Sequence, residues 1–260
     1  MGRQALPIQR GPVVLDGAMG SMLLAAGVFQ ADRLHRACLE NPVAVDEVHR
    51  GHAESGASVA TTNTFLVAGE REPLASEIMA RAISLARGHG GVWASVGPAS
   101  PAPKSPPAWW ARLGEADAIL FETWSGSDLL PWLSFPRPRP IILNFCLGKC
   151  GTRTLGGWTI SEVAGLAHEH AAAAVGFNCG WEGHAEDHPR AVGLLRRATT
   201  LPIVARPASC GLDPDEWAKM ALRCVEAGAT HIGGCCGATP GHIKSLFDMI
   251  GPRRATHGLS

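Results

Sequence analysis

Short apolar runs recur along the whole chain and alternate with segments of helical periodicity. Most of these runs are continuously apolar rather than strictly alternating, which is typical of parallel strands covered on both faces. We predict eight strands from them, at residues 12–19, 58–65, 91–98, 117–124, 140–147, 173–180, 201–208 and 230–237.

The segments between these runs have the polar and apolar spacing of amphipathic helices. They predict helices over residues 42–55, 73–87, 161–172, 185–198, 213–228 and 239–250. Asn41 before Pro42 is a typical helix start, and Asp213 has the same capping role for a later helix. The proline-rich stretch 99–116 leaves room only for a short third helix.

Eight strand–helix units in 260 residues predict an α/β chain folded as a single (β/α)₈ TIM barrel. An open doubly wound sheet is the rival architecture, but eight regular units favour closure. We find no linker, so we expect one domain over residues 1–260 with a core at about 12–250.

Composition narrows the function classes. Lys plus Arg and Asp plus Glu number 23 each. The chain therefore lacks the excess of basic residues that is typical of nucleic-acid-binding proteins. No run reaches the length of a membrane span, and the first residues lack a signal-peptide pattern, which predicts a cytoplasmic protein. The eight cysteines therefore indicate free thiols or metal ligands rather than disulfides.

Thiols gather where predicted strands end, which in such a barrel is the active-site face. Cys179 follows the sixth strand, and Cys235 and Cys236 follow the eighth. Three thiolates from these ends can hold zinc and leave one tetrahedral position open, as in catalytic sites. Flanking glycines such as Gly237 would give adjacent ligands the backbone freedom they need. Small cysteines filling a tapered barrel are the alternative interpretation.

Several motifs, taken in order, resemble those of the homocysteine S-methyltransferase family. They are "LDGAMGSML", "TTNTF", "FET", "VGFNCG" and "IGGCCGATPGHI", and they span nearly the whole chain. The resemblance implies a (β/α)₈ barrel in which Cys179, Cys235 and Cys236 hold zinc. It also implies that a substrate thiol, homocysteine, takes the fourth position and accepts a methyl group to give methionine.

The methyl donor is the open part of this prediction. We expect a small onium compound, S-methylmethionine or S-adenosylmethionine, with a betaine-like donor as a further option. A second hypothesis is the homocysteine-binding half of a split methionine synthase that takes its methyl group from a separate corrinoid protein. A third is a zinc- or thiol-binding barrel without catalysis.

Further residues receive roles within this resemblance. Asp16 and Glu122 are expected to accept hydrogen bonds from the substrate ammonium, and the Gly17 and Ala18 amides to bind its carboxylate. Side chains expected to line or support the site are Asn63, Thr64 and Asn178. Aromatic faces attract onium groups, so the weaker donor-binding candidates are Trp124, Trp158 and Trp181.

The sequence also departs from the family pattern. After the seventh strand it reads "ARPASCG" where many members carry a Tyr-Pro-Asn sequence, and there is no tyrosine in the chain. Cys210 would lie between the two zinc-bearing strand ends, where an unassigned loop thiol is the simpler interpretation. Cys146 and Cys150 provide only two ligands, too few for a second metal site.

Overall fold

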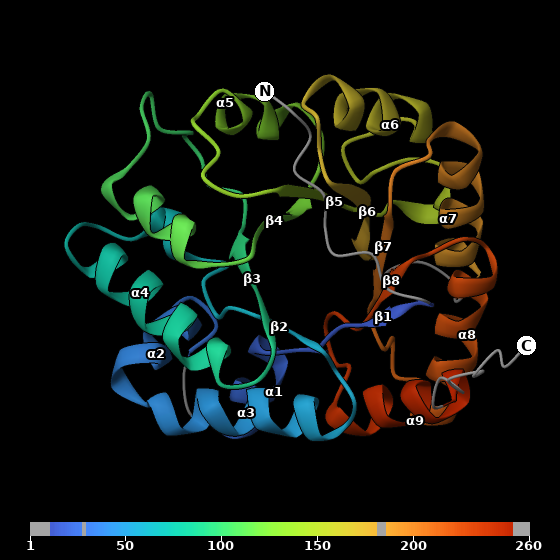
Figure 1. The fold of residues 1–260 in the computed structure, drawn as a ribbon, viewed down its shortest axis with the longest axis horizontal. Helices are drawn as coiled ribbons and strands as arrows, with labels where there is room; N and C mark the ends of the chain where they lie inside the picture. The colour runs from blue at the N-terminus through green and yellow to red at the C-terminus, as the bar shows by residue number, and fades with distance from the viewer. Residues whose placement is uncertain (1–10, 28–29, 181–185, 252–260) are drawn as a thin grey trace, which may run out of the picture.

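The computed structural model describes residues 11–27, 30–180 and 186–251. Within them, a single parallel sheet has the strand order β1-β8-β7-β6-β5-β4-β3-β2. A parallel bridge between Leu15 and Val59 joins β1 to β2, the strands at the two ends of this order, and so closes the barrel. The predicted (β/α)₈ barrel is therefore confirmed (Figure 1).

The strands are shorter than the apolar runs that predicted them. Their bounds are β1 Val13–Val14, β2 Val59–Thr61, β3 Gly91–Val96, β4 Ala118–Trp124, β5 Ile141–Cys146, β6 Ala174–Cys179, β7 Ile203–Pro207 and β8 His231–Ile232. The first and last strands have two residues each, because the backbone leaves the sheet at Asp16 and at Gly233.

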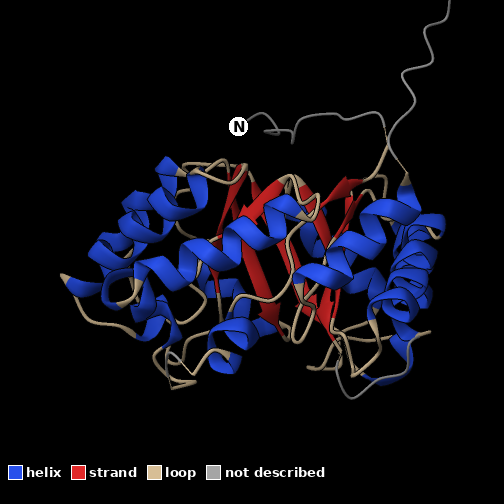
Figure 2. Cartoon of the chain, turned by 90° about the horizontal axis from the view of Figure 1, so that it is seen from below, coloured by secondary structure: helices blue, strands red, loops and turns tan. Residues whose placement is uncertain are grey.

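Helices lie around the strands (Figure 1), and the view from below shows helices in front of the strands and at both ends of the molecule (Figure 2). The longer ones are α3 Pro42–Glu54, α4 Leu74–Arg87, α6 Ile160–Glu169, α7 Asp187–Ala198, α8 Pro214–Glu226 and α9 Pro240–Ile250. The shorter ones are α1 Gly20–Ala25, α2 Ala37–Glu40, α5 Leu130–Leu133, η1 Leu34–Arg36, η2 Val67–Gly69, η3 Ala108–Glu115, η4 Ser127–Leu129 and η5 Lys149–Gly151. The third helical position holds η3, a 3₁₀ helix, as the proline-rich stretch predicted.

The predicted helix starts agree with the caps in the structure. The Asn41 side chain accepts a hydrogen bond from the Ala44 amide, and Pro42 begins α3. The Asp213 side chain accepts from the amides of Asp215 and Glu216 at the start of α8. Among the described helices, none combines the length and apolar character that a membrane span requires.

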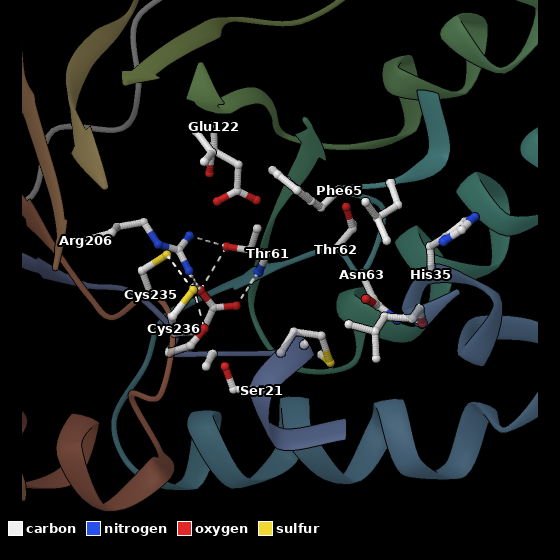
Figure 3. Close-up of a pocket in the computed structure, with 18 of the residues that line it drawn as sticks. Ser21, His35, Thr61, Thr62, Asn63, Phe65, Glu122, Arg206, Cys235 and Cys236 are labelled. Carbon is white, nitrogen blue, oxygen red and sulfur yellow. Dashed lines mark hydrogen bonds and ion pairs between the residues drawn. The ribbon is translucent and has the colours of Figure 1, made fainter. Parts of the chain in front are cut away.

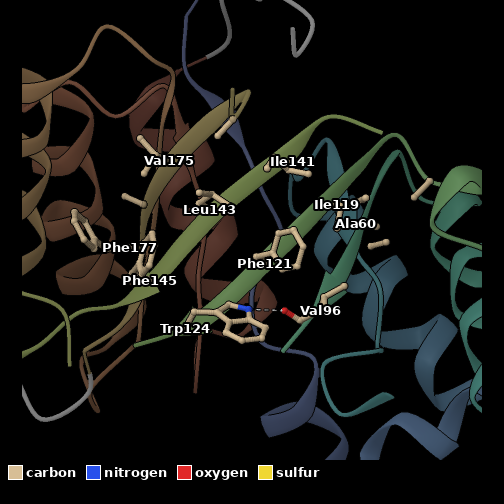
Figure 4. Packing of buried hydrophobic residues seen from close by; sticks show 14 of the residues in the cluster. Ala60, Val96, Ile119, Phe121, Trp124, Ile141, Leu143, Phe145, Val175 and Phe177 are labelled. Atoms are coloured by element: carbon tan, nitrogen blue, oxygen red, sulfur yellow. Dashed lines mark hydrogen bonds between the residues drawn. The ribbon is translucent and has the colours of Figure 1, made fainter. Parts of the chain in front are cut away.

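Alternate strand residues separate into two apolar cores. One faces the helices and includes Phe121, Leu143 and Phe177 (Figure 4). The other fills the barrel interior, with members such as Trp93, Leu120 and Ile142. Burying each large side chain contributes about 1.5–3 kcal/mol. The interior core is formed by residues in the amino-terminal and middle parts of the strands. Polar residues occupy the carboxyl ends of the strands, where the site lies.

Candidate active site

A cavity of about 280 Å³ opens at the carboxyl ends of the strands (Figure 3). Its polar wall combines Asp16, Thr61, Glu122, Arg206 and Cys235. The rest of the lining is Gly17, Ala18, Met19, Gly20, Ser21, Ala31, Leu34, His35, Thr62, Asn63, Phe65, Leu66, Thr123 and Cys236. The cavity thus joins a charged and thiol-bearing side to a largely apolar one.

Three thiols meet beside this cavity. The sulfurs of Cys179, Cys235 and Cys236 all lie within 4.8 Å of one another. The Cys179 and Cys236 sulfurs are 4.0 Å apart, and those of Cys235 and Cys236 are 3.9 Å apart. Ligands about 2.3 Å from a tetrahedral zinc ion lie about 3.8 Å from each other. The donor set and its spacing therefore suit three of the four zinc ligands.

Crowding makes these thiols poor acids on their own. The neighbouring Cys179 sulfur and burial raise the pKa of the Cys236 thiol to about 11. A second negative sulfur so close to the first is unfavourable in the absence of a counter-charge. A divalent cation would reverse this balance, because it stabilises thiolates directly.

The local backbone turns the three sulfurs toward one point. Cys179 has φ 61°, and its carbonyl contacts His188 Nε2 at 2.9 Å. The Cys235 amide donates to the Pro207 carbonyl, which ties the loop after β8 to the end of β7. Gly237 has φ 76°, and a Cβ there would lie 2.3 Å from the Ser209 hydroxyl. The freedom predicted for this glycine is therefore required.

Asn178 connects three of the strand ends. Its Oδ1 accepts from the Thr123 amide at 2.9 Å, and its Nδ2 donates to the Thr123 hydroxyl at 2.7 Å. The same Nδ2 lies 3.7 Å from the Cys235 sulfur. Thr123 has φ 65°, an unusual value for a β-branched residue. Asn178 therefore holds a strained residue and a predicted metal ligand in one arrangement.

Asp16 lies in the cavity wall, but its carboxylate is already engaged. It accepts from the Thr61 amide at 2.6 Å and from the Thr61 hydroxyl at 2.8 Å. It also pairs with Arg206 at 2.8 Å, where both side chains are 4% exposed. Burial opposes the charge of Arg206, but Asp16 and Glu122 outweigh it and raise the pKa of the guanidinium.

Arg206 was not among the residues assigned to the site from the sequence. The available signal was a single charged residue inside the apolar run "LPIVARPA". Such a residue is rarely buried without a partner. Its partner Asp16 is 190 positions away, so no local pattern connects the two.

Glu122 lies at the end of β4 and lines the same cavity. The Ser95 hydroxyl donates a short hydrogen bond to its Oε1. Burial raises the pKa of Glu122, against the opposing effect of Arg206. A bound cation would favour the ionised carboxylate.

The other predicted residues take varied positions. Asn63 lines the cavity and donates to the Leu34 carbonyl at 2.7 Å. Gly17 and Ala18 also line it, but the Ala18 amide donates to the Ala238 carbonyl at 2.8 Å and is not available for a substrate carboxylate. Thr64 is fully buried, and its hydroxyl donates to the Ser95 carbonyl.

None of the tryptophan candidates that the structure describes lines the cavity. Trp124 is fully buried among aromatic side chains, and its Nε1 donates to the Val96 carbonyl at 3.0 Å (Figure 4). Trp158 is half-buried and packs against the core that faces the helices. Trp181 lies outside the described residues. Phe65 is an aromatic residue that does line the cavity.

The remaining cysteines do not form a second cluster. Cys146 is buried and interacts with the Cys179 thiol, whereas Cys150 and Cys210 are exposed. Among the described residues, only Cys179, Cys235 and Cys236 form a group of three or more side chains that could hold a metal ion.

The fold and site together define a class: a parallel β/α barrel with a three-thiol centre at its active-site face. The model of the homocysteine S-methyltransferase family matches residues 13–250. The chain belongs to this family, and the family predicted from its motifs is confirmed.

Known proteins agree with this assignment. Methionine synthase of Mycobacterium tuberculosis is 29% identical over 92% of this chain, and the chain spans only 24% of that protein. Selenocysteine methyltransferase of Astragalus bisulcatus is 26% identical over 39% of this chain and 34% of its own length. The metallated form of the homocysteine methyltransferase MmuM from Escherichia coli has the same fold, with a TM-score of 0.73 and 24% identity over 92% of this chain and 96% of that one.

Proposed function

We propose that this protein is a zinc-dependent S-methyltransferase that converts homocysteine to methionine with a small onium methyl donor. The observation that carries the proposal is the group of three cysteine sulfurs within 4.8 Å of one another beside a cavity. The family match supports homocysteine as the acceptor. The MmuM structure in a metallated form supports a metal in the same fold.

The three cysteines would hold the ion, and the acceptor thiol would approach from the cavity. A zinc ion bound there would favour loss of the thiol proton and would hold the sulfur in place. The acceptor sulfur then forms a bond to the methyl carbon while the bond from that carbon to the donor's onium centre breaks. The electron pair stays with the donor, which leaves as a neutral thioether or amine, so no strong general acid is required.

The apolar part of the cavity suits the methyl donor. Phe65, Leu34, Leu66 and Met19 line it, and Phe65 lies across the cavity from Cys235 (Figure 3). An onium group is attracted to an aromatic face, and Phe65 provides one. This lining suits a small onium donor, for which we propose S-methylmethionine or S-adenosylmethionine, with a betaine-like compound as a further option.

A second candidate function is supported by the methionine synthase relatives. The mycobacterial sequences match 92% of this chain, and the chain spans about a quarter of their length. The barrel would then be the homocysteine-binding half of a methionine synthase, and its methyl group would come from methylcobalamin on a separate corrinoid protein.

The test is to purify the protein under reducing conditions, measure its zinc, and assay methionine formation from homocysteine. The donor panel includes S-methylmethionine, S-adenosylmethionine, betaine and methylcobalamin. We expect about one zinc per chain and turnover with an onium donor. Turnover with methylcobalamin alone supports the second candidate.

Substitution of one predicted ligand links the metal to the activity. Cys236→Ser should lose most of the zinc and lower activity by at least 100-fold, because two thiolates hold the ion much more weakly than three. Cys150→Ser is the matched control, since Cys150 is an exposed thiol outside the cluster. Zinc-loaded protein without turnover on any donor would leave a non-catalytic thiol-binding barrel, and protein that binds no zinc would refute the mechanism.

A further inference from the structure

The cavity contains a charge arrangement that the sequence did not reveal. Asp16, expected to receive a substrate ammonium, instead receives three hydrogen bonds from Thr61 and Arg206. A carboxylate offers about four acceptor positions, so most of its capacity is used. The positive charge that balances Asp16 therefore belongs to the protein.

Arg206 lies in the cavity wall on the thiol side (Figure 3). Its Nε donates to the Gly234 carbonyl at 3.1 Å, one terminal nitrogen donates to the Thr61 hydroxyl at 2.6 Å, and the other to Asp16 at 2.8 Å. The terminal nitrogen that donates to Asp16 also makes a longer contact with the Gly17 carbonyl, at 3.5 Å. The four contacts fix the plane of the guanidinium and use four of its five N–H groups, which leaves one N–H on the terminal nitrogen that bonds Thr61.

A purely structural ion pair is the competing interpretation. However, a buried ion pair rarely stabilises a fold more than apolar residues of similar size would. This pair lies where the cavity meets Cys235, not in the interior core below. Its position beside Cys235 in the cavity wall is explained if a ligand in the cavity uses it.

We propose that Arg206, held in place by Asp16, determines acceptor specificity by binding the carboxylate of the acceptor thiol, while Glu122 faces its ammonium. This rests on the proposed function, in which an amino-acid thiol occupies the cavity. It assigns the carboxylate to a side chain rather than to the amides of Gly17 and Ala18, of which the Ala18 amide is already bonded to Ala238. Asp16 is then a positioning residue for Arg206.

The proposal is tested by comparing ligands that differ by one group. Isothermal titration of the zinc-loaded protein would give dissociation constants for homocysteine, 4-sulfanylbutanoate (no ammonium) and 3-aminopropane-1-thiol (no carboxylate). We expect loss of the carboxylate to weaken binding about 10- to 100-fold, since charged hydrogen bonds have this value. Methionine and 3-(methylsulfanyl)propan-1-amine give the same comparison without requiring a bound metal.

Variants locate the effect at Arg206. In Arg206→Gln, homocysteine should bind about 10- to 100-fold more weakly, while 3-aminopropane-1-thiol should change less than about threefold, because the lost interaction involves the carboxylate. Arg206→Lys keeps the positive charge but lacks the planar guanidinium, so it should restore part of the preference for homocysteine over 3-aminopropane-1-thiol. The double variant Asp16→Asn/Arg206→Gln removes both charges and leaves no unpaired carboxylate. Circular dichroism and zinc content check that each variant is folded.

Two results would overturn the assignment. One is a wild-type protein that binds the ligand without a carboxylate as tightly as homocysteine, a comparison that needs no variant. The other is an equal loss for both ligands in Arg206→Gln and in the double variant, which would make Arg206 structural only. Binding is measured without a methyl donor, so a protein that shows the expected preference but no turnover would refute the methyl transfer and leave this assignment standing.

Discussion

At the scale of single residues, the site depends on side chains that hold other side chains. Cys179, Cys235 and Cys236 supply the sulfurs, but Asn178 joins Thr123 to Cys235 and Asp16 orients Arg206. Such supporting contacts commonly change metal affinity or activity by 10- to 100-fold when removed. The supporting residues are therefore as informative to mutate as the predicted ligands.

Asn178→Ala should weaken zinc binding about 10- to 100-fold, because Cys235 loses its amide contact and Thr123 loses the partner that holds its left-handed conformation. Competition with a chromophoric chelator measures the affinity. Asn144→Ala is the matched control, since Asn144 is equally buried in the next strand and its amide has no hydrogen-bond partner among the described residues. Equal zinc affinity in both variants would show that Asn178 does not support the metal centre.

At the scale of elements, β4 shows how a local irregularity changes a predicted role. Its pairing with β5 shifts register between Phe121 and Trp124. In a regular strand Glu122 and Trp124 would face the same side, two residues apart. The shift at Thr123 sends Glu122 into the cavity and Trp124 into the aromatic core. Phe65, not Trp124, is thus the aromatic residue that lines the cavity.

Helix α8 provides a test of element stability apart from the site. Asp213→Ala removes the side chain that accepts from two amides at its start, which should lower the free energy of unfolding by about 1 kcal/mol. Urea unfolding measures the change, and zinc content should stay the same. Lys219→Ala, at an exposed position of the same helix, is the control and should have little effect. A loss of zinc in Asp213→Ala would instead couple the cap to the metal centre.

At the scale of the whole molecule, the barrel buries several neutral histidines. Burial lowers the pKa of His49, His188 and His231 from 6.5 to about 4 in each case. These histidines therefore become protonated below about pH 6.5 in the unfolded chain, but only below about pH 4 in the folded chain. Their contribution to stability is complete above pH 6.5 and falls as the pH falls toward 4.

Three such histidines give a slope of up to about 4 kcal/mol per pH unit in this range. The unfolding midpoint in urea, measured from pH 7 to pH 4.5, should show this decline. His231→Gln should reduce the slope by up to about 1.4 kcal/mol per pH unit, because it removes one of these groups. A midpoint independent of pH between 7 and 5 would contradict the assignment of neutral buried histidines.

Some of this molecule could be predicted from its sequence and some could not. The barrel follows from eight repeated units, and the three thiols follow from their positions after the sixth and eighth strands. The Asp16–Arg206 pair could not be predicted, because it forms between residues 190 positions apart. The position of Trp124 depends on a register shift that leaves no mark in the apolar pattern.

The order of the strands along the chain determines when each part of the site is synthesised. Asp16 emerges first, Arg206 almost 200 residues later, and the two cysteines after β8 last of all. Until then a growing chain has only Cys179 from the thiol cluster, and a single thiolate holds zinc poorly. Under the proposed function, zinc capture and acceptor binding would begin only when the last strand has joined β1.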